Sequence, residues 1–273
     1  MSHSSQIKEH KSTPEKGLHF LIEDEESYNA AIYLHNFYEQ LFNGKVGAPV
    51  HEKLQNGAKV LEFRYDGGVW VTEVAAEYPN SKFYSVHSII PNSRDNINNI
   101  TFIGCNSFTK LPFPDNEFDY VYAKDSLIFM GKNTLRGVLS EIFRILKPGG
   151  KSWLNAQNID YGILENENLE NYLYETGKIE SISYRIIENR IRRDYAFGEF
   201  IFEIFLLYYR IQRHFLAPFM KISFEEFDNL VNNVESELDA DDDGMEIRHK
   251  RVLVKKSSYT IPSTNEICTA LTL

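Results

Sequence analysis

Apolar residues recur along this chain in two patterns, one typical of short buried strands and one typical of amphipathic helices. Residues 59–70 and those that follow show both patterns in succession. They predict a buried strand over 60–63, a tight turn over 65–68 and a helix from about 70 to 78. A strand, turn and helix in this order form the opening unit of a nucleotide-binding type of sheet, in which the turn lets a ligand approach the backbone closely.

The same patterns predict further elements around that unit. The expected elements are helices over 23–42 and 134–146, a short helix before Gly57, and strands over 82–87, 100–104, 118–122 and from 153 onward. Lys147-Pro-Gly-Gly150 ends the helix over 134–146, because proline cannot continue it and glycine takes a left-handed cap. Strands that alternate with helices at this spacing require right-handed crossovers. The sequence therefore predicts an α/β fold: a Rossmann-like, doubly wound, mostly parallel sheet with helices on both faces and a helical C-terminal addition.

Beyond residue 155 the pattern becomes helical and charged. It predicts helices over 164–179, 199–214 and 223–238, the last opened by the capping box Ser223-Phe-Glu-Glu226. Charged residues interrupt the apolar helix around Phe205 well short of the roughly 20 residues that a membrane span needs, so we expect a buried helix, a lid or an oligomer contact. The domain boundaries that we expect are a disordered segment over 1–18, one domain over 19–256 with a helical insertion or cap at about 160–240, and a flexible tail over 257–273.

Composition narrows the classes of partner. The chain has 273 residues, 42% of them hydrophobic, and a net charge of −10, which disfavours nucleic acid and anionic membranes as partners. The basic runs over 190–193 and 248–256 are interpreted as solvated faces. Cys105 and Cys268 lack the spacing of metal ligands, so we predict no metal site, no disulfide framework and a reducing compartment. We expect a cytoplasmic protein, with the nucleus left open, whose partner is a protein or a small-molecule ligand, and which forms a possible homo-oligomer.

Three segments carry a resemblance to a known family. They are Leu111-Pro-Phe-Pro-Asp115, Phe118-Asp-Tyr-Val121 and Glu141-Ile-Phe-Arg-Ile-Leu-Lys-Pro-Gly-Gly150. In this order, after a glycine-containing turn, they resemble the class I S-adenosylmethionine-dependent methyltransferases, and among these the small-molecule methyltransferases of fungi. Residues 216–226 are also similar to the C-terminal part of one such fungal group. The resemblance covers about 20–254 and implies the methyltransferase fold for that region.

The resemblance also implies where a cofactor would bind. In the family the first turn reads acidic-x-Gly-x-Gly-x-Gly, the second strand ends in an acid that accepts both ribose hydroxyls, and an Asp after the third strand receives the adenine amino group. The matching positions in this chain are Glu62, Arg64, Asp66 and Gly68 in the turn, His87 after the second strand and Asn106 after the third. The motif is thus degenerate: two glycines are replaced, and a neutral imidazole offers one acceptor where a carboxylate offers two.

Three hypotheses follow from this motif. The first is a methyltransferase-fold protein that has lost S-adenosylmethionine binding and acts as a non-catalytic partner or regulator, with no cofactor expected and no catalytic residue assigned. The alternative is an active S-adenosylmethionine-dependent methyltransferase on a small molecule with an atypical cofactor loop, for which His87 and Asp125 are candidate bases. The third is a pocket for an anionic ligand, walled by Arg64 and His87.

Overall fold

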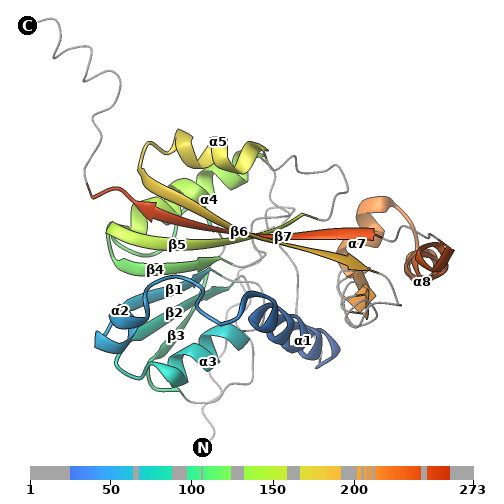
Figure 1. Cartoon of the computed structure of the whole chain (residues 1–273), viewed down its shortest axis with the longest axis horizontal. Helices are drawn as coiled ribbons and strands as arrows, with labels where there is room; N and C mark the ends of the chain where they lie inside the picture. The colour runs from blue at the N-terminus through green and yellow to red at the C-terminus, as the bar shows by residue number, and fades with distance from the viewer. Residues whose placement is uncertain are drawn as a thin grey trace, which may run out of the picture.

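One seven-stranded sheet forms the centre of the protein. The computed structural model describes residues 25–63, 68–87, 97–105, 107–123, 132–158, 167–191, 202–203, 206–207, 209–210, 213–240 and 245–258. The strands are β1 (Lys59–Phe63), β2 (Lys82–His87), β3 (Ile100–Gly104), β4 (Phe118–Ala123), β5 (Leu146–Asn158), β6 (Ile179–Ile191) and β7 (Met245–Lys256). They lie in the order β3-β2-β1-β4-β5-β7-β6 (Figure 1). The first five pair in parallel, and β7 pairs antiparallel with both β5 and β6.

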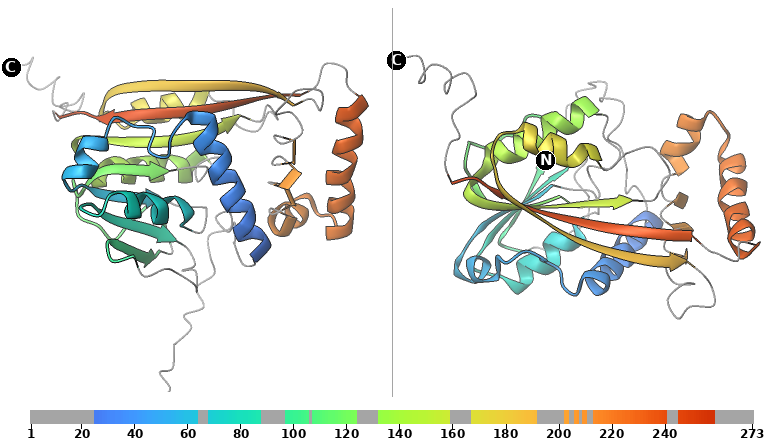
Figure 2. Two further views of the ribbon diagram at one scale, coloured as in Figure 1. Left: turned by 60° about the horizontal axis from the view of Figure 1, so that its bottom comes forward. Right: turned by 45° about the horizontal axis from the view of Figure 1, so that its top comes forward.

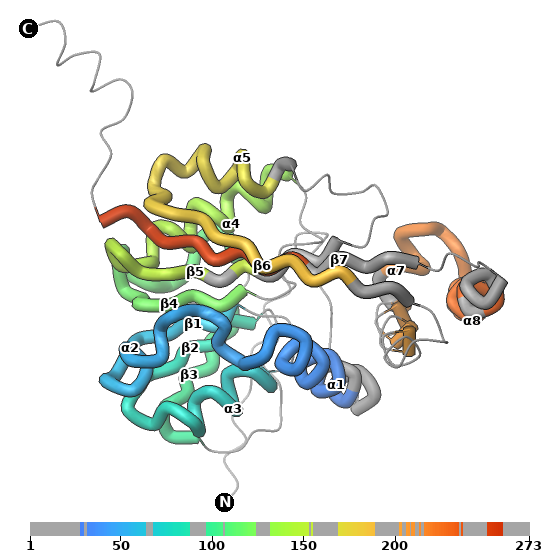
Figure 3. Tube along the Cα trace, in the orientation of Figure 1, coloured from blue at the N-terminus to red at the C-terminus, as the bar shows by residue number. Residues whose placement is uncertain are grey.

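Helices cover both faces of this sheet. On one face pack α4 (Lys132–Ile145) and α5 (Glu167–Glu175), and on the other pack α2 (His51–Asn56) and α3 (Val69–Glu77) (Figures 1 and 3). An apolar core lies on each face of the sheet, and successive residues of β1 point into opposite cores. Val60 packs in the core on the α3 side and Leu61 in the core on the α4 side. The predicted Rossmann-like, mostly parallel sheet with helices on both faces is therefore confirmed.

A third apolar cluster lies beyond one end of the sheet. It joins α1 (Glu25–Phe42) to α7 (Arg213–Met220), α8 (Phe224–Ala240) and the buried side chains of Phe202 and Leu206. Figure 2 shows α1 beside the arrowheads of the parallel strands, with α7 and α8 farther out on the same side. The cluster therefore stands next to the carboxyl ends of the parallel strands, where α/β sheets bind their ligands.

Many predicted elements are confirmed, some to the residue. The strands over 82–87 and 100–104 have the predicted bounds, and α3 begins one residue before the predicted start. In the capping box that precedes α8, the Glu226 amide donates to the Ser223 hydroxyl oxygen at 3.1 Å, and the Ser223 amide donates to Glu226 Oε2 at 2.8 Å. After α4 the strand β5 begins at Leu146, earlier than the predicted start at 153, and Gly149 adopts a left-handed φ of +71° within it.

The helical interpretation of the chain beyond residue 155 is wrong in part. The helix predicted over 164–179 ends at Glu175, and Ile179 begins the 13-residue strand β6. The 12-residue strand β7 was also not predicted. Pairing between β6 and β7 joins segments more than 50 residues apart, and such long-range contacts override local helical preference.

The interpretation of residues 248–256 as a solvated face is also wrong, because this run forms the inner strand β7. Arg251 is only 2% exposed; its guanidinium donates to the Tyr38 carbonyl at 3.4 Å and lies 3.7 Å from the centre of the Phe42 ring. Lys256 is also buried and donates to Asn116 Oδ1 at 2.8 Å, and burial lowers the pKa of its ammonium group to about 8. Both cations are buried because other parts of the fold supply oxygen acceptors or an aromatic face.

Several predictions concern residues outside the described ranges. These are the terminal segment over 1–18, most of the tail over 257–273, the basic residues 192–193 and the apolar helix at Phe205. Of that apolar stretch, Phe202 and Leu206 are described and buried, which agrees with a buried helix. None of the helices in the described ranges combines the length and apolar character that a bilayer span requires.

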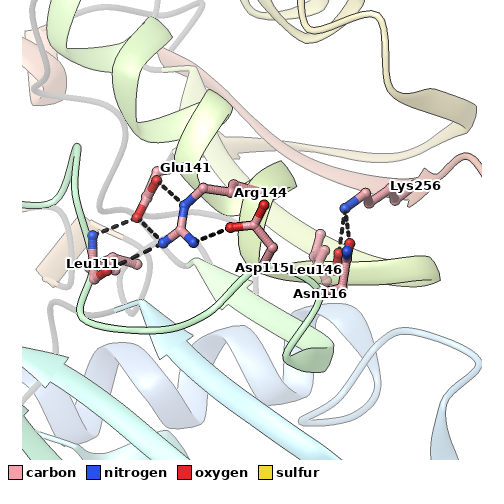
Figure 4. A network of polar contacts seen from close by, with 7 residues as sticks. All are labelled: Leu111, Asp115, Asn116, Glu141, Arg144, Leu146 and Lys256. Atoms are coloured by element: carbon pink, nitrogen blue, oxygen red, sulfur yellow. Dashed lines mark hydrogen bonds and ion pairs between the residues drawn. The ribbon is translucent and has the colours of Figure 1, made fainter. Parts of the chain in front are cut away.

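An ion-pair network centred on the buried Glu141 holds the loop that precedes β4 against α4, as Figure 4 shows. Glu141 accepts from the Leu111 amide at 2.6 Å and from the Arg144 guanidinium at 2.6 and 2.8 Å. Arg144 also donates to Asp115 Oδ1 at 2.6 Å. Burial raises the pKa of the Glu141 carboxyl, but the hydrogen bonds from Arg144 and Leu111 outweigh it, so the pKa is lowered.

We expect Glu141→Gln to lower the free energy of unfolding by about 1 to 3 kcal/mol at pH 7, because Arg144 loses a buried ionic partner. The stability from this depressed pKa is fully present above the unfolded-state pKa of about 4.3 and is lost as the pH falls through the folded-state value. The difference in free energy of unfolding between wild type and variant should therefore become smaller in acid. Urea denaturation at pH 7 and at about pH 3.5 measures both effects.

Glu175→Gln is the matched control for this prediction. Glu175 also accepts two hydrogen bonds from an arginine, Arg136, but both side chains are exposed. We expect no measurable change in the urea midpoint, because water screens an exposed pair. Equal losses in the Glu141 and Glu175 variants would contradict the assigned importance of the buried network.

Candidate functional site

The carboxyl ends of β1 and β2 bring three polar side chains together. Glu62 and Ser85 are register partners in neighbouring strands, and His87 lies two residues after Ser85 on the same face of β2. The Ser85 hydroxyl donates to Glu62 Oε2, and its oxygen lies 2.8 Å from His87 Nε2. All three are buried: Glu62 is 1% exposed and His87 is 5% exposed. The hydrogen bonds offset part of the cost of burying a carboxylate and an imidazole.

Phe102 and Gly68 lie next to these polar groups. The Phe102 ring lies 5.7 Å from the His87 ring, centre to centre. The same ring approaches Gly68, the residue that precedes α3 and has a φ of +81°. A Cβ atom at Gly68 would lie 3.2 Å from Phe102 Cε1, so both the backbone conformation and the close approach of the ring favour glycine.

The structure thus brings together three of the six predicted site positions: Glu62, Gly68 and His87. The other three predicted positions and one candidate base lie outside the described residues; they are Arg64, Asp66, Asn106 and Asp125. The structure consequently leaves the proposed anionic pocket at Arg64 and His87 as a prediction.

Sequence reasoning missed Ser85 and Phe102. Ser85 had a detectable signal, since it lies two residues before His87 in a predicted strand and so on the same face. Its contact with Glu62 depends on the register of β1 against β2, which the sequence alone does not define. Phe102 was predicted only as an apolar residue of a strand.

A second polar cluster fastens α1 to α3 near the same end of the sheet. Ligand atoms of His35, Glu39 and Glu73 lie within 4.8 Å of one another, which makes them a candidate cation site. However, the Lys45 ammonium lies 2.7 Å from Glu73 Oε2, and His35 Nε2 lies 3.2 Å from the same oxygen. Burial raises the pKa of the Glu73 carboxyl, but Lys45 and His35 outweigh it and lower the pKa. Because a lysine already neutralises the carboxylate, we assign this cluster a structural role.

The residues at the ends of β1 and β2 fit the cofactor that the resemblance implies. A carboxylate and an imidazole are groups that can accept from and donate to a polar nucleoside, and Gly68 lies beside them at the start of α3. In open α/β sheets, ligands bind outside the carboxyl ends of the strands, which is where these groups lie. The replacement of an acid by His87 changes the contact but retains a polar group at this position.

A protein-family model described as "Methyltransferase domain" matches residues 72–154 of this chain. The sterol 24-C-methyltransferase erg-4 of Neurospora crassa is 43% identical over 67 residues, which cover 23% of this chain and 16% of that protein. ERG6B of Gibberella zeae, also a sterol 24-C-methyltransferase, is 36% identical over 102 residues, or 36% of this chain and 20% of that protein. The matched part is thus a fifth or less of the length of these two relatives.

Solved structures of related shape include two with TM-scores of 0.49. One is the [4+2]-cyclase SpnF, which is 16% identical over 83% of this chain and 80% of its own. The other is a phosphoethanolamine N-methyltransferase 2 of Haemonchus contortus, determined with phosphomonomethylethanolamine and S-adenosylhomocysteine. It is 19% identical over 87% of this chain and 59% of its own.

We expect Gly68→Ala to lower the free energy of unfolding by about 1 to 3 kcal/mol, because the new Cβ strains a left-handed backbone and pushes on Phe102. Gly177→Ala is the control: Gly177 has a φ of +62°, but no atom lies within 4 Å of an added Cβ, so it reports the backbone strain alone. Urea denaturation should show a larger loss for the Gly68 variant. Equal losses would show that the contact with Phe102 does not require glycine.

Proposed function

We propose that this chain belongs to the class I S-adenosylmethionine-dependent methyltransferase family and is an active enzyme that transfers a methyl group to a small organic acceptor. The observation that carries the proposal is the group of Glu62, Gly68 and His87 at the carboxyl ends of β1 and β2 and the start of α3. A match to the methyltransferase domain model over 72–154 supports it.

In this proposal the residues that hold the cofactor are those of the described site. S-adenosylmethionine, when bound, supplies an electrophilic methyl group. Glu62 and His87 provide polar contacts at the strand ends, and Gly68 forms the turn at the start of α3. Catalysis of this kind depends largely on holding the acceptor in line with the methyl group, so few chemically active side chains are needed.

The acceptor class that we propose to test first is apolar and sterol-like. The relatives that match this chain are named sterol 24-C-methyltransferases, and one from Yarrowia lipolytica is 54% identical over 43 residues. The helices α7 and α8 lie beyond the carboxyl ends of the strands (Figure 2) and expose the apolar side chains of Phe219, Met220 and Leu230, which places an apolar surface on the same side of the sheet as the proposed cofactor site. An apolar acceptor would gain from burial there.

A non-catalytic partner or regulator is the second candidate function. It is favoured by one observation: His87 stands where the family has an acid, and its Nε2 is within hydrogen-bond distance of Ser85. A single imidazole acceptor does not reproduce a carboxylate that accepts two hydroxyls. The two candidates differ in whether the protein binds the cofactor, so a binding titration separates them.

We expect the wild-type protein to bind S-adenosylmethionine and S-adenosylhomocysteine with dissociation constants of about 1 to 100 μM, measured by isothermal titration calorimetry. Glu62→Gln should weaken binding by about tenfold, because the amide removes the charge beside the ligand and disturbs the bond to Ser85. Glu175→Gln, an exposed change on α5, should bind as the wild type does.

A folded wild-type protein that gives no binding heat with either ligand would contradict the enzymatic proposal and favour the non-catalytic one. Where binding is seen, transfer of a radiolabelled methyl group from S-adenosylmethionine to a panel of sterols and polar amines tests the acceptor class. Label found only in the polar amines would contradict the apolar acceptor but leave the methyltransferase activity intact.

A further inference from the structure

The three polar groups at the ends of β1 and β2 form a chain in which the middle member has a single proton. Ser85 lies between Glu62 and His87, contacts both, and is fully buried. A serine hydroxyl donates one hydrogen bond and accepts others through its oxygen. Its neighbours therefore compete for that one proton, and the direction of the Ser85 hydroxyl determines whether His87 Nε2 donates or accepts in their contact.

The geometry directs the Ser85 hydroxyl hydrogen toward Glu62. The Ser85 hydroxyl donates to Glu62 Oε2, and an ionised carboxylate only accepts. The Ser85 oxygen is then left to accept from His87 Nε2, which lies 2.8 Å away and must carry a hydrogen to make this bond. In a neutral imidazole with its proton on Nε2, the lone pair lies on Nδ1.

We propose that Ser85 is a positioning residue, which holds His87 in the tautomer that carries its proton on Nε2 and fixes the imidazole relative to the Glu62 carboxylate. Ser85 does this in two ways. Its hydroxyl donates a hydrogen bond to the buried carboxylate, and its oxygen offers the imidazole ring one acceptor in a defined direction. Its effect on cofactor affinity rests on the function proposed above, whereas its effect on the tautomer does not.

Burial makes this role hard to replace. Ser85 has no exposed surface, and the Phe102 ring packs on His87, so the imidazole is held by packing as well as by its hydrogen bond. Without the hydroxyl, Glu62 Oε2 loses a donor and His87 Nε2 loses an acceptor at the same time. Two buried polar groups would thus be affected by the loss of one oxygen atom.

The test is the tautomer of His87, read by two-bond ¹H–¹⁵N correlation spectra of the full chain labelled at histidine, at about pH 7.5, where free histidine is mostly neutral. The chain has eight histidines, so the His87 signals are assigned as those that vanish in His87→Gln. We expect a single tautomer with the proton on Nε2 in the wild type. Ser85→Ala should give a mixture of tautomers or a changed ring signal, and Ser85→Thr, which keeps the hydroxyl, should restore the wild-type signal.

Ser152→Ala is the matched control. Ser152 is another fully buried serine, whose hydroxyl donates to the Val121 carbonyl at 3.3 Å; it lies on β5, which pairs with β4 and β7 and not with the strands of Glu62 and His87. The His87 signal should remain unchanged in this variant. A wild-type ring with its proton on Nδ1, a doubly protonated ring, or a Ser85→Ala spectrum identical to that of the wild type would each overturn the proposal.

Calorimetric titration with S-adenosylmethionine gives the second readout. We expect Ser85→Ala to bind about tenfold more weakly than the wild type, with Ser85→Thr and Ser152→Ala within about threefold of it, since one buried hydrogen-bonding group is lost only in the first. A wild type that binds no cofactor but shows the Nε2 tautomer would contradict the proposed function and leave the positioning role intact. Equal affinities in Ser85→Ala and the wild type would overturn the link to the cofactor.

Discussion

The fold depends on how it satisfies the charged groups that it buries. Glu62, Glu141 and Arg251 are each almost inaccessible to solvent, and each is met by hydrogen-bonding or aromatic partners from another element. The cost of burying an unpaired charge is far larger than the gain from any one of these contacts. Each charged group can therefore be buried only when the other segments that supply its partners are also folded.

Arg251 shows how this requirement links the ends of the chain. It lies on β7, yet it donates to the Tyr38 carbonyl and stacks on Phe42, both in α1 and more than 200 residues away. Arg185 on β6 donates to the Phe42 carbonyl at 2.6 Å, so two arginines bind carbonyls in the last turns of the same helix. The family model matches 72–154, which contains neither β1 nor β7. The matched segment therefore supplies β2, β3, β4 and most of β5, and the sheet is completed by strands outside it, including the central strand β1.

Sequence patterns predicted the parallel half of the sheet well and the antiparallel half poorly. The strands over 82–87 and 100–104 are short and bounded by turns, so local residues specify them. In β7 the alternation that would indicate a strand is obscured, because Arg251 and Lys256 point inward as apolar residues normally do. Their acceptors, Tyr38 and Asn116, are more than 100 residues away, and no local pattern reveals them.

Glu62, Gly68 and His87, three of the predicted site positions, lie together at the ends of β1 and β2 and the start of α3, but the chemistry of such a group cannot be inferred one position at a time. Comparison with a family motif treats His87 as one weakened contact, independent of the others. In the structure the imidazole is joined through Ser85 to Glu62, so a change at one of the three residues alters the hydrogen bonding of the other two. Energies of groups in one network do not add. The sum of separate losses at each changed position is therefore a poor measure of whether this edge of the sheet binds a cofactor.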